Sequence, residues 1–417
     1  MLSLSLSLSL LSMAFLIFYY SKLKKQFGAS SLPPFPPKRL LALSQAQLDE
    51  RRTNLERYIQ MVSQDTGIAA CDNFNSFLLN AQQESMQQIS EPVILDIFLM
   101  NGHKISVNIT STDQTEDVLE AVASQIEIPE EHVYYFGIYL VKKEDDGDNC
   151  IVRKLQDFES PYISLKAAKG PHRIVLRKSY WDSSFDDDLL NNRVTMNLLY
   201  VQAVNDVERQ WVLATKDQFM QLTALQQKGS KRDYIRLVRT LKFYGYIHFR
   251  PCITDYPEPN TLVLLAVGNK ELNFRIQTGK DQYKEGSFKI TRMRCWRITT
   301  IYPDRDNNSN KDNKPQLEIS FEYLLSKDKL QWINIKSGQA ILVSMCLQAM
   351  VDELIMKKEG KKIKRPCDRI RCSRGYYLNR DSKSPIINSN QNMSHSNSEN
   401  EDQSAIDKAV DSVKKEI

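Results

Sequence analysis

The chain has 417 residues, of which 41% are hydrophobic and 26% are charged, and its formal net charge is +5. These fractions are typical of globular domains with sizeable cores, and they exclude a wholly disordered, collagen-like or polytopic membrane protein. The length suits about two to four domains of ordinary size, and the small positive charge gives no general indication of nucleic-acid binding.

Residues 1–20 form a hydrophobic N-terminal segment in which leucine and serine alternate as far as Ser9. No basic residue precedes the apolar run and no small-x-small cleavage site follows it, so a secretory signal peptide is disfavoured. Three interpretations stay open: a wrongly chosen start codon, a segment that associates with a membrane, and a packed strand, whose period the alternation matches.

Residues 21–90 indicate a helical unit. Four prolines between positions 33 and 37 predict an extended polyproline stretch, because each proline fixes φ and removes a hydrogen-bond donor. Ser44 is then a candidate helix N-cap. The helix after Ser44 is predicted from apolar residues at helical spacing, namely Leu48, Leu55, Tyr58, Ile59 and Val62. A second helix is predicted over residues 73–83.

Residues 92–170 predict a unit of ubiquitin size. Two apolar runs, 93–99 and 105–109, flank the turn pair Asn101-Gly102 and indicate a β-hairpin. A helix over residues 116–126 and a strand over residues 135–141 follow, and they complete a ββαβ order.

Residues 171–260 predict an all-helical unit. An amphipathic helix is expected around residues 196–207 and a second over residues 216–227. A third is expected over residues 233–244, with Gly245 as its C-cap.

Residues 261–358 predict six strands and one terminal helix over residues 337–356, which is the layout of a pleckstrin-like sandwich. Residues 359–417 are basic and then rich in Ser, Asn and Glu without periodicity, so we expect a disordered tail. The stretch 357–374 holds nine lysines and arginines. These residues either contact acidic lipid or form a solvated tail or a run like a nuclear-import signal.

Three stretches carry a resemblance to a known family: STDQTEDVLEAV at 111–122, LRKSYWD at 176–182 and RMRCWR at 292–297. They resemble the sorting nexins that join a PX domain to a FERM-like module, and the similarity runs over most of the chain. The resemblance implies an α+β multidomain fold. A truncated PX helical remnant (21–90) is followed by a ubiquitin-like F1 lobe (92–170), a helical F2 lobe (171–260) and a pleckstrin-homology/PTB-like F3 lobe (261–358).

The resemblance also implies a function. Such proteins are cytoplasmic cargo adaptors, peripheral on early endosome membranes, that promote endocytic recycling and intracellular protein transport. The family ends in an acidic, aromatic tail that binds a retrieval complex, so such a complex is a further expected partner. Residues 410–417 do not match that tail.

For the PX remnant, the resemblance implies binding to phosphatidylinositol 3-phosphate membranes. A lysine after the proline loop and an arginine on the following helix hold the headgroup in PX domains, and Lys38 and Arg51 match these positions. The family's strand arginine has no counterpart, so we expect weakened lipid binding. The alternative is that both residues are ordinary solvated charges.

For the F3 lobe, the resemblance implies capture of Asn-Pro-x-Tyr or Asn-Pro-x-Phe motifs in receptor cytoplasmic tails. The motif would add a strand beside the terminal helix by β-augmentation. The residues expected to grip the peptide are Trp296, Leu324, Val351 and Ile355. The alternative is that these side chains are simply part of the hydrophobic core.

No motif indicates catalysis, since a nucleophile elbow, an H-E-x-x-H pair and a P-loop are all missing. Seven scattered cysteines without C-x-x-C spacing are typical of reduced cytosolic thiols rather than a disulfide framework or zinc site. We therefore expect no enzyme activity, cofactor, metal or nucleic-acid partner. The alternative function is a FERM-type structural linker between membrane proteins and the cortical cytoskeleton.

Overall fold

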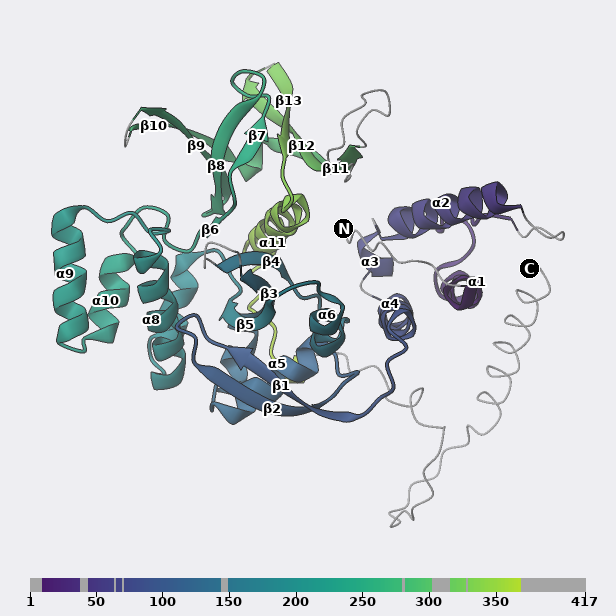
Figure 1. Ribbon diagram of the computed structural model, residues 1–417, viewed down its shortest axis with the longest axis horizontal. Helices are drawn as coiled ribbons and strands as arrows, with labels where there is room; N and C mark the ends of the chain where they lie inside the picture. Colours follow the sequence, from purple (N-terminus) through teal and green to yellow (C-terminus); the bar gives the residue numbers. More distant parts are fainter. Residues whose placement is uncertain are drawn as a thin grey trace, which may run out of the picture.

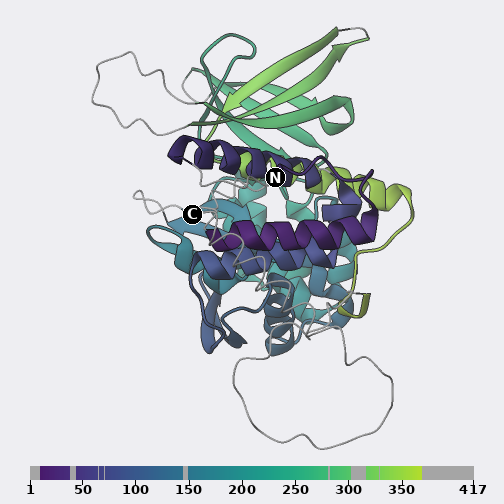
Figure 2. The same ribbon diagram turned by 90° about the vertical axis from the view of Figure 1, so that its right-hand side faces the viewer.

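The structure is a computed structural model that describes residues 10–37, 44–63, 65–69, 71–143, 149–279, 282–301, 316–327 and 329–368. A helical unit at the N-terminal end lies beside a larger body, which contains a five-stranded sheet, a group of helices and an eight-stranded sheet (Figure 1). From the side, the eight-stranded sheet forms the upper part of the molecule and the N-terminal helices cross the front (Figure 2).

The N-terminal helical unit contains α1 (Leu10–Phe27), α2 (Gln45–Val62), α3 (Thr66–Ala69) and α4 (Asp72–Ser85). Tyr19 and Leu23 of α1 are buried, and the Tyr19 ring lies 5.1 Å from the ring of Phe77 on α4. The strand interpretation is wrong for residues 10–20, which belong to helix α1, whereas residues 1–9 lie outside the described residues. Within the described residues, no helix has both the length and the apolarity needed to cross a membrane.

The helices predicted after Ser44 and over residues 73–83 are confirmed as α2 and α4. The N–H of Ser44 donates to the side chain of Gln47 at 3.0 Å, as in a capping box at the start of α2. The apolar side chains that α2 and α4 bury in a shared core include Leu55, Tyr58, Val62, Phe74, Phe77 and Leu78.

The first lobe is a sheet of β1 (Pro92–Phe98), β2 (Lys104–Thr110), β3 (Phe136–Lys143), β4 (Asn149–Lys154) and β5 (His172–Lys178), with α5 (Thr115–Gln125) and α6 (Pro161–Ala167). The strand order is β2-β1-β5-β3-β4. The predicted hairpin is confirmed, with Ile97 opposite Ile105 and Gly102 in the turn at φ +83°. Because β5 lies at the centre and parallel to β1, the sheet extends past the boundary expected at residue 170.

The second lobe consists of α7 (Asp186–Leu189), α8 (Arg193–Glu208), α9 (Lys216–Gln227) and α10 (Lys231–Val238). The third predicted helix ends at Val238, so the expectation that it reaches Tyr244 is wrong. The N–H of Leu213 donates to the carbonyl of Lys242 at 3.0 Å, and Phe243 has φ +65°. The chain therefore leaves helical geometry before Gly245.

The third lobe contains β6 (Ile247–His248), β7 (Cys252–Thr254), β8 (Thr261–Gly268), β9 (Glu271–Gly279), β10 (Gln282–Lys289), β11 (Met293–Ile301), β12 (Gln316–Ser326), β13 (Lys329–Lys336) and α11 (Ala340–Lys358). The strand order is β10-β9-β8-β7-β13-β12-β11, and β6 pairs with β8. The six predicted strands and the terminal helix are confirmed. Strands β6 and β7 precede residue 261, so the sheet begins earlier than expected.

The three lobes share their hydrophobic cores. One core joins Tyr139 and Ile151 of the first lobe with Phe321 and Leu347 of the third lobe. A second core joins the first lobe with Leu199 and other residues of the second lobe. Burial of this kind favours one packed module over separate domains on linkers.

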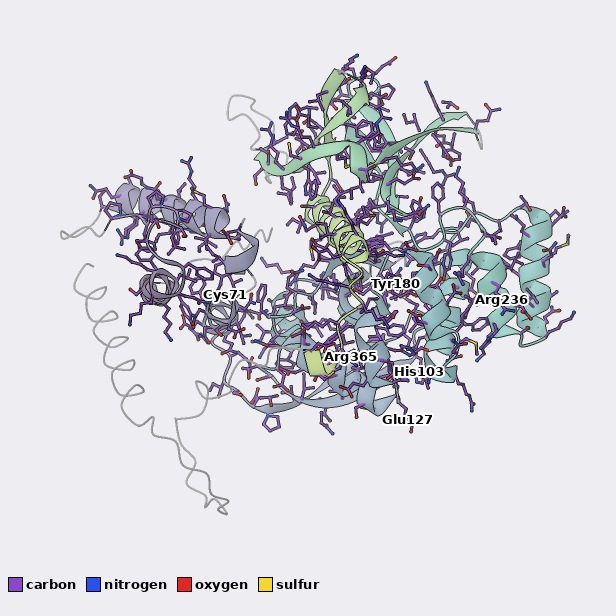
Figure 3. All side chains as sticks on the ribbon, turned by 180° about the vertical axis from the view of Figure 1, so that it is seen from behind. Cys71, His103, Glu127, Tyr180, Arg236 and Arg365 are labelled. Atoms are coloured by element: carbon purple, nitrogen blue, oxygen red, sulfur yellow. The ribbon has the colours of Figure 1, made fainter. Side chains whose placement is uncertain are left out.

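A buried carboxylate lies where the lobes meet. The side chain of Asp186 is fully buried; it accepts a hydrogen bond from the hydroxyl of Tyr180 and another, of 3.0 Å, from Tyr244. Arg239 Nε lies 3.3 Å from the same carboxylate. Figure 3 labels Tyr180 at this central position. Burial and the nearby Asp186 charge raise the pKa of both tyrosines.

The segment after α11 returns to the first lobe. Ile363 packs against the first-lobe core, and Lys364 Nζ lies 2.6 Å from Glu116 Oε1 on α5. Lys364 also lies over the ring of Tyr134, 5.3 Å from its centroid. Arg365 accordingly lies beside the first lobe (Figure 3). The expected disordered tail is therefore wrong for residues 361–368; residues 369–417 lie outside the described part of the chain.

Candidate peptide-binding surface and phosphoinositide contacts

Strand β11 is an edge strand. It stands at the end of the strand order and pairs with β12 alone among the described residues. Helix α11 packs beside it. An edge strand leaves a row of backbone N–H and C=O groups that an added strand can use. We call the open edge of β11, together with Trp296, Val351 and Ile355, the β11–α11 surface.

Trp296 connects the strand to the helix. Its cross-strand partner on β12 is Phe321, which is fully buried, so the two side chains lie on the core face of the sheet. The indole Nε1 donates to the hydroxyl of Ser344 on α11 at 3.1 Å. Trp296 is only partly buried against the core, so part of the ring is left for a ligand.

Val351 and Ile355 lie along the same face of α11 as Ser344. They follow Ser344 by seven and eleven residues, which is about two and three turns of an α-helix. Val351 is half-buried against the core, whereas Ile355 is 49% exposed. The structure thus brings Trp296, Val351 and Ile355 to one side of α11, with apolar area that the fold does not fully bury.

Leu324 does not join this surface. On β12 the side chains of Phe321 and Tyr323 are buried in the core, and Leu324 follows Tyr323 by one residue. Neighbouring residues of a strand point to opposite faces. Leu324 therefore lies on the outer face, opposite Leu330 of β13, so the structure does not bring it together with Trp296, and its contact with a peptide stays a prediction.

The other face of α11 is held by the lobe junction. Glu353 lies about 200° around the helix from Val351. Its carboxylate accepts hydrogen bonds from the backbone N–H groups of Trp181 at 2.8 Å and Asp182 at 2.7 Å. Burial raises the pKa of Glu353, and these two N–H groups oppose the rise. Helix α11 is thus fixed on one side and open on the other.

Of the two expected lipid contacts, Lys38 lies outside the described residues. Arg51 on α2 is 8% exposed, and its guanidinium donates to the carbonyl of Pro37 at 2.9 Å. The ring of Phe35 stacks on Tyr20, with centroids 4.5 Å apart. Arg51 is therefore not an ordinary solvated charge; it holds the end of the proline stretch, next to Lys38.

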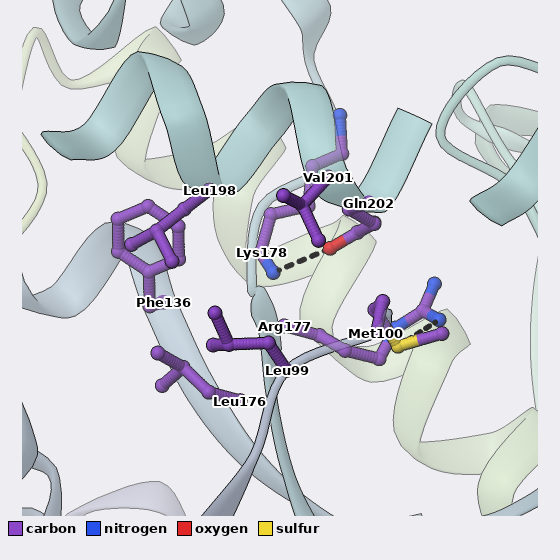
Figure 4. A pocket seen from close by; sticks show the side chains of 9 residues that line it. All are labelled: Leu99, Met100, Phe136, Leu176, Arg177, Lys178, Leu198, Val201 and Gln202. Atoms are coloured by element: carbon purple, nitrogen blue, oxygen red, sulfur yellow. Dashed lines mark hydrogen bonds between the residues drawn. The ribbon is translucent and has the colours of Figure 1, made fainter. Parts of the chain in front are cut away.

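The pocket that the first and second lobes form is too small for an organic cofactor. The pocket between the first and second lobes, shown in Figure 4, has a volume of about 10 Å³, which is room for a single water. Its polar contacts are internal, since the Lys178 N–H donates to Gln202 at 3.0 Å. The described part of the chain also holds no group of side chains that could bind a metal ion.

Sequence reasoning missed Ser344 and Glu353. Both lie inside an apolar helix, where a serine and a glutamate give no local sign of their partners. Their partners are Trp296 and the backbone of residues 181–182, which are far away in the sequence.

Four known domain families match the chain. They are "PX domain" at residues 18–81, "Sorting nexin 17/27/31, FERM domain, F1 lobe" at 93–181, "Sorting nexin 17/31, FERM domain, F2 lobe" at 182–242 and "Sorting Nexin 17 FERM C-terminal domain" at 245–355. The expected α+β fold, with PX helices followed by three FERM-like lobes, is confirmed.

Related proteins cover most of the chain. Sorting nexin-17 of Danio rerio is 51% identical over 352 residues, which are 83% of this chain and 74% of the relative. Sorting nexin-17 of Homo sapiens is 48% identical over 351 residues, 83% of this chain and 75% of the relative. Sorting nexin-31 of Homo sapiens is 37% identical over 345 residues, 81% of this chain and 76% of the relative.

Among solved structures, the MyTH4-FERM MF2 domain of Dictyostelium discoideum myosin VII (mutant 1) matches with a TM-score of 0.45 and 10% identity, covering 82% of this chain and 79% of that one. The relatives and the four matched domains agree on one assignment. The chain belongs to the sorting nexin 17/31 family, whose members join a PX domain to a FERM-like module.

Proposed function

We propose that this chain is an endosomal cargo adaptor that binds Asn-Pro-x-Tyr or Asn-Pro-x-Phe motifs in receptor cytoplasmic tails. It acts without enzyme chemistry, peripherally on early endosome membranes that contain phosphatidylinositol 3-phosphate, and it promotes endocytic recycling. Family membership supports the endosomal sorting role. The PX domain implies phosphoinositide binding, and the FERM-like lobes imply binding of peptide motifs in partner tails.

The observation that carries the peptide proposal is the open edge of β11 beside the partly exposed Trp296, Val351 and Ile355. Backbone groups of β11 would pair with the extended motif. The indole and the two aliphatic side chains would receive its aromatic residue, because large apolar contacts dominate such binding sites. The peptide must lose conformational freedom to become a strand, so an affinity of about micromolar is expected.

For the lipid, Lys38 and Arg51 are the proposed phosphoinositide contacts. The family's lysine binds a phosphate and its helix arginine binds ring hydroxyls, and each charge-assisted contact is worth about 1.5–3 kcal/mol. Arg51 has a second proposed role: by holding the Pro37 carbonyl it positions the residue that follows, Lys38. A retrieval complex is a further proposed partner, through the tail.

The peptide proposal is tested by calorimetric titration of the full chain with two peptides. An Asn-Pro-x-Tyr peptide should bind with about micromolar affinity, and the same peptide with alanine in place of tyrosine should bind at least tenfold more weakly, roughly 1.4 kcal/mol. Equal affinities, or no heat with either peptide, would contradict the proposal.

The lipid proposal is tested by sedimentation with vesicles that contain phosphatidylinositol 3-phosphate. Lys38→Ala should weaken binding about tenfold or more. Arg57→Ala serves as the matched control, because Arg57 is exposed on the same helix as Arg51. Equal losses in the two variants would show that general charge, rather than a headgroup site, binds the vesicles.

A further inference from the structure

The hairpin of β12 and β13 carries an exposed apolar pair. Leu324 and Leu330 are direct cross-strand partners on its outer face, and Leu330 is 43% exposed. Trp332 follows two residues after Leu330 on the same face and is half-buried. The core side of these strands is already filled, so the apolar pair has no role in the core of the lobe.

Basic side chains surround this apolar pair. The guanidinium of Arg297 lies over the Trp332 ring, 4.7 Å from its centroid, and Arg292 donates to the carbonyl of Leu325 at 2.8 Å. We call residues 292–297 and 322–332 the β12–β13 tip. Its acids are Glu322, which pairs with Arg294, and Asp328, and its five basic residues leave three net positive charges. The five basic residues of the tip are Arg292, Arg294, Arg297, Lys327 and Lys329.

The hairpin tip lies away from the other lobes. Strands β12 and β13 rise at the top of the molecule, above α11, and the first two lobes lie below (Figure 1). Its outer face is also opposite to the face that carries Trp296, because Trp296 pairs with the core residue Phe321. A ligand on the tip would therefore leave the β11–α11 surface open.

We propose that the β12–β13 tip docks on an anionic lipid bilayer, with Leu330 in the interfacial region and Lys327 and Lys329 at the headgroups. The chemistry favours a bilayer over a protein partner, because lysine is depleted in protein interfaces whereas lysine and tryptophan are typical of membrane interfaces. Each lysine or arginine near an anionic surface adds attraction. The tip combines this charge with an apolar pair.

This contact goes beyond the proposed function, because it needs neither phosphatidylinositol 3-phosphate nor a cargo peptide. Stable attachment to a membrane usually takes two weak signals. The headgroup contacts of the PX remnant and the tip of the third lobe would supply two such signals within one chain, and simultaneous contact would raise the overall affinity.

The test is sedimentation of the full chain with phosphatidylcholine vesicles, with and without phosphatidylserine, in the absence of phosphoinositide. The wild type should bind the phosphatidylserine vesicles more tightly, and added salt should weaken the binding. Lys327→Ala combined with Lys329→Ala should weaken it roughly tenfold. Leu330→Ser should weaken it as well, with its melting temperature unchanged.

The control variant is Lys216→Ala combined with Lys228→Ala, which removes the same charge from exposed positions on and just after α9. It should retain wild-type vesicle binding. All variants should keep wild-type affinity for the Asn-Pro-x-Tyr peptide, which separates this proposal from the cargo proposal. Full vesicle binding by the Lys327/Lys329 variant would overturn the proposal and would favour a protein partner for the tip. An equal loss of vesicle binding in the control variant would also overturn the proposal.

Discussion

The indole nitrogen of Trp296 on β11 donates a hydrogen bond of 3.1 Å to the hydroxyl of Ser344 on α11. Ser344 is buried, so the bond ties the edge strand to the helix in a defined geometry. A ring that turned away would leave a buried polar group unpaired, which costs about 1–3 kcal/mol. The bond therefore preorganises the largest apolar side chain of the β11–α11 surface.

We expect Ser344→Ala to lower the affinity for an Asn-Pro-x-Tyr peptide about threefold to tenfold, because the indole loses its anchor. The melting temperature should stay within a few degrees of the wild type. Calorimetry and thermal melts measure the two quantities. Ser326→Ala, the same change at an exposed serine at the end of β12, is the control. An unchanged affinity in Ser344→Ala would show that the bond has no role in binding.

Glu353 should be important for stability rather than for cargo. Glu353→Ala leaves the N–H groups of Trp181 and Asp182 without their acceptor, and we expect a loss of about 2–4 kcal/mol in the free energy of unfolding. Chemical denaturation measures it. Asp352→Ala, at the exposed neighbouring position, should change stability by less than about 0.5 kcal/mol. Similar losses of stability in both variants would show that the two hydrogen bonds accepted by Glu353, which we call the Glu353 clamp, do not stabilise the fold.

Glu84 on α4 should make the stability depend on pH. Burial raises the pKa of Glu84 to about 7, from an ordinary value of 4.5, and its Oε2 has no hydrogen-bond partner among the described residues. The folded state thus holds a proton that the unfolded state releases, so stability should fall as the pH rises from about 4.5 through 7.

Glu84→Gln removes this penalty. We expect it to raise the free energy of unfolding at pH 8 by an amount on the order of 1 kcal/mol, discounted for partial exposure, and to have little effect at pH 4. Denaturation at both pH values measures the difference. Glu258→Gln, at an exposed position, is the control. An equal gain at both pH values would contradict the role of the buried carboxylate.

The segment 361–368 should itself resist proteases, because it packs against the first lobe. Ile363→Asp places a charge against the first-lobe core, so we expect the segment to detach and cleavage between residues 358 and 368 to become rapid. Limited proteolysis with mass spectrometry locates the cuts. Lys362→Glu, exposed in the same segment, should keep the wild-type pattern. Rapid cleavage of the wild type at these sites would refute the docked segment.

The sequence predicted the strands of the third lobe well, because alternation and turn residues are local signals. It did not place β5, since the pairing partner of Ile174 is Ile97, more than seventy residues earlier. Leu324 is a different case. Resemblance to the family assigned it to the peptide site, whereas its position one residue after Tyr323 places it on the outer face of the sheet.

The sites depended on tertiary contacts that no local pattern contains. Arg51 lies on a helix whose apolar spacing excludes it, yet the guanidinium is buried because the carbonyl of Pro37 lies within reach. The clamp of Glu353 and the bond of Ser344 similarly join segments that are distant in the sequence. Resemblance to a family supplied Trp296, Val351 and Ile355; periodicity alone did not distinguish them from core residues.

The most direct test of the cargo proposal is the affinity of an Asn-Pro-x-Tyr peptide for Trp296→Ala, measured by calorimetry beside the thermal melt of the same sample. We expect roughly a thirtyfold loss of affinity, on the order of 2 kcal/mol, with a melt within a few degrees of the wild type. Val351→Asp should behave in the same way. A collapsed melt for Trp296→Ala, or an affinity equal to that of the wild type, would contradict a peptide site on the β11–α11 surface.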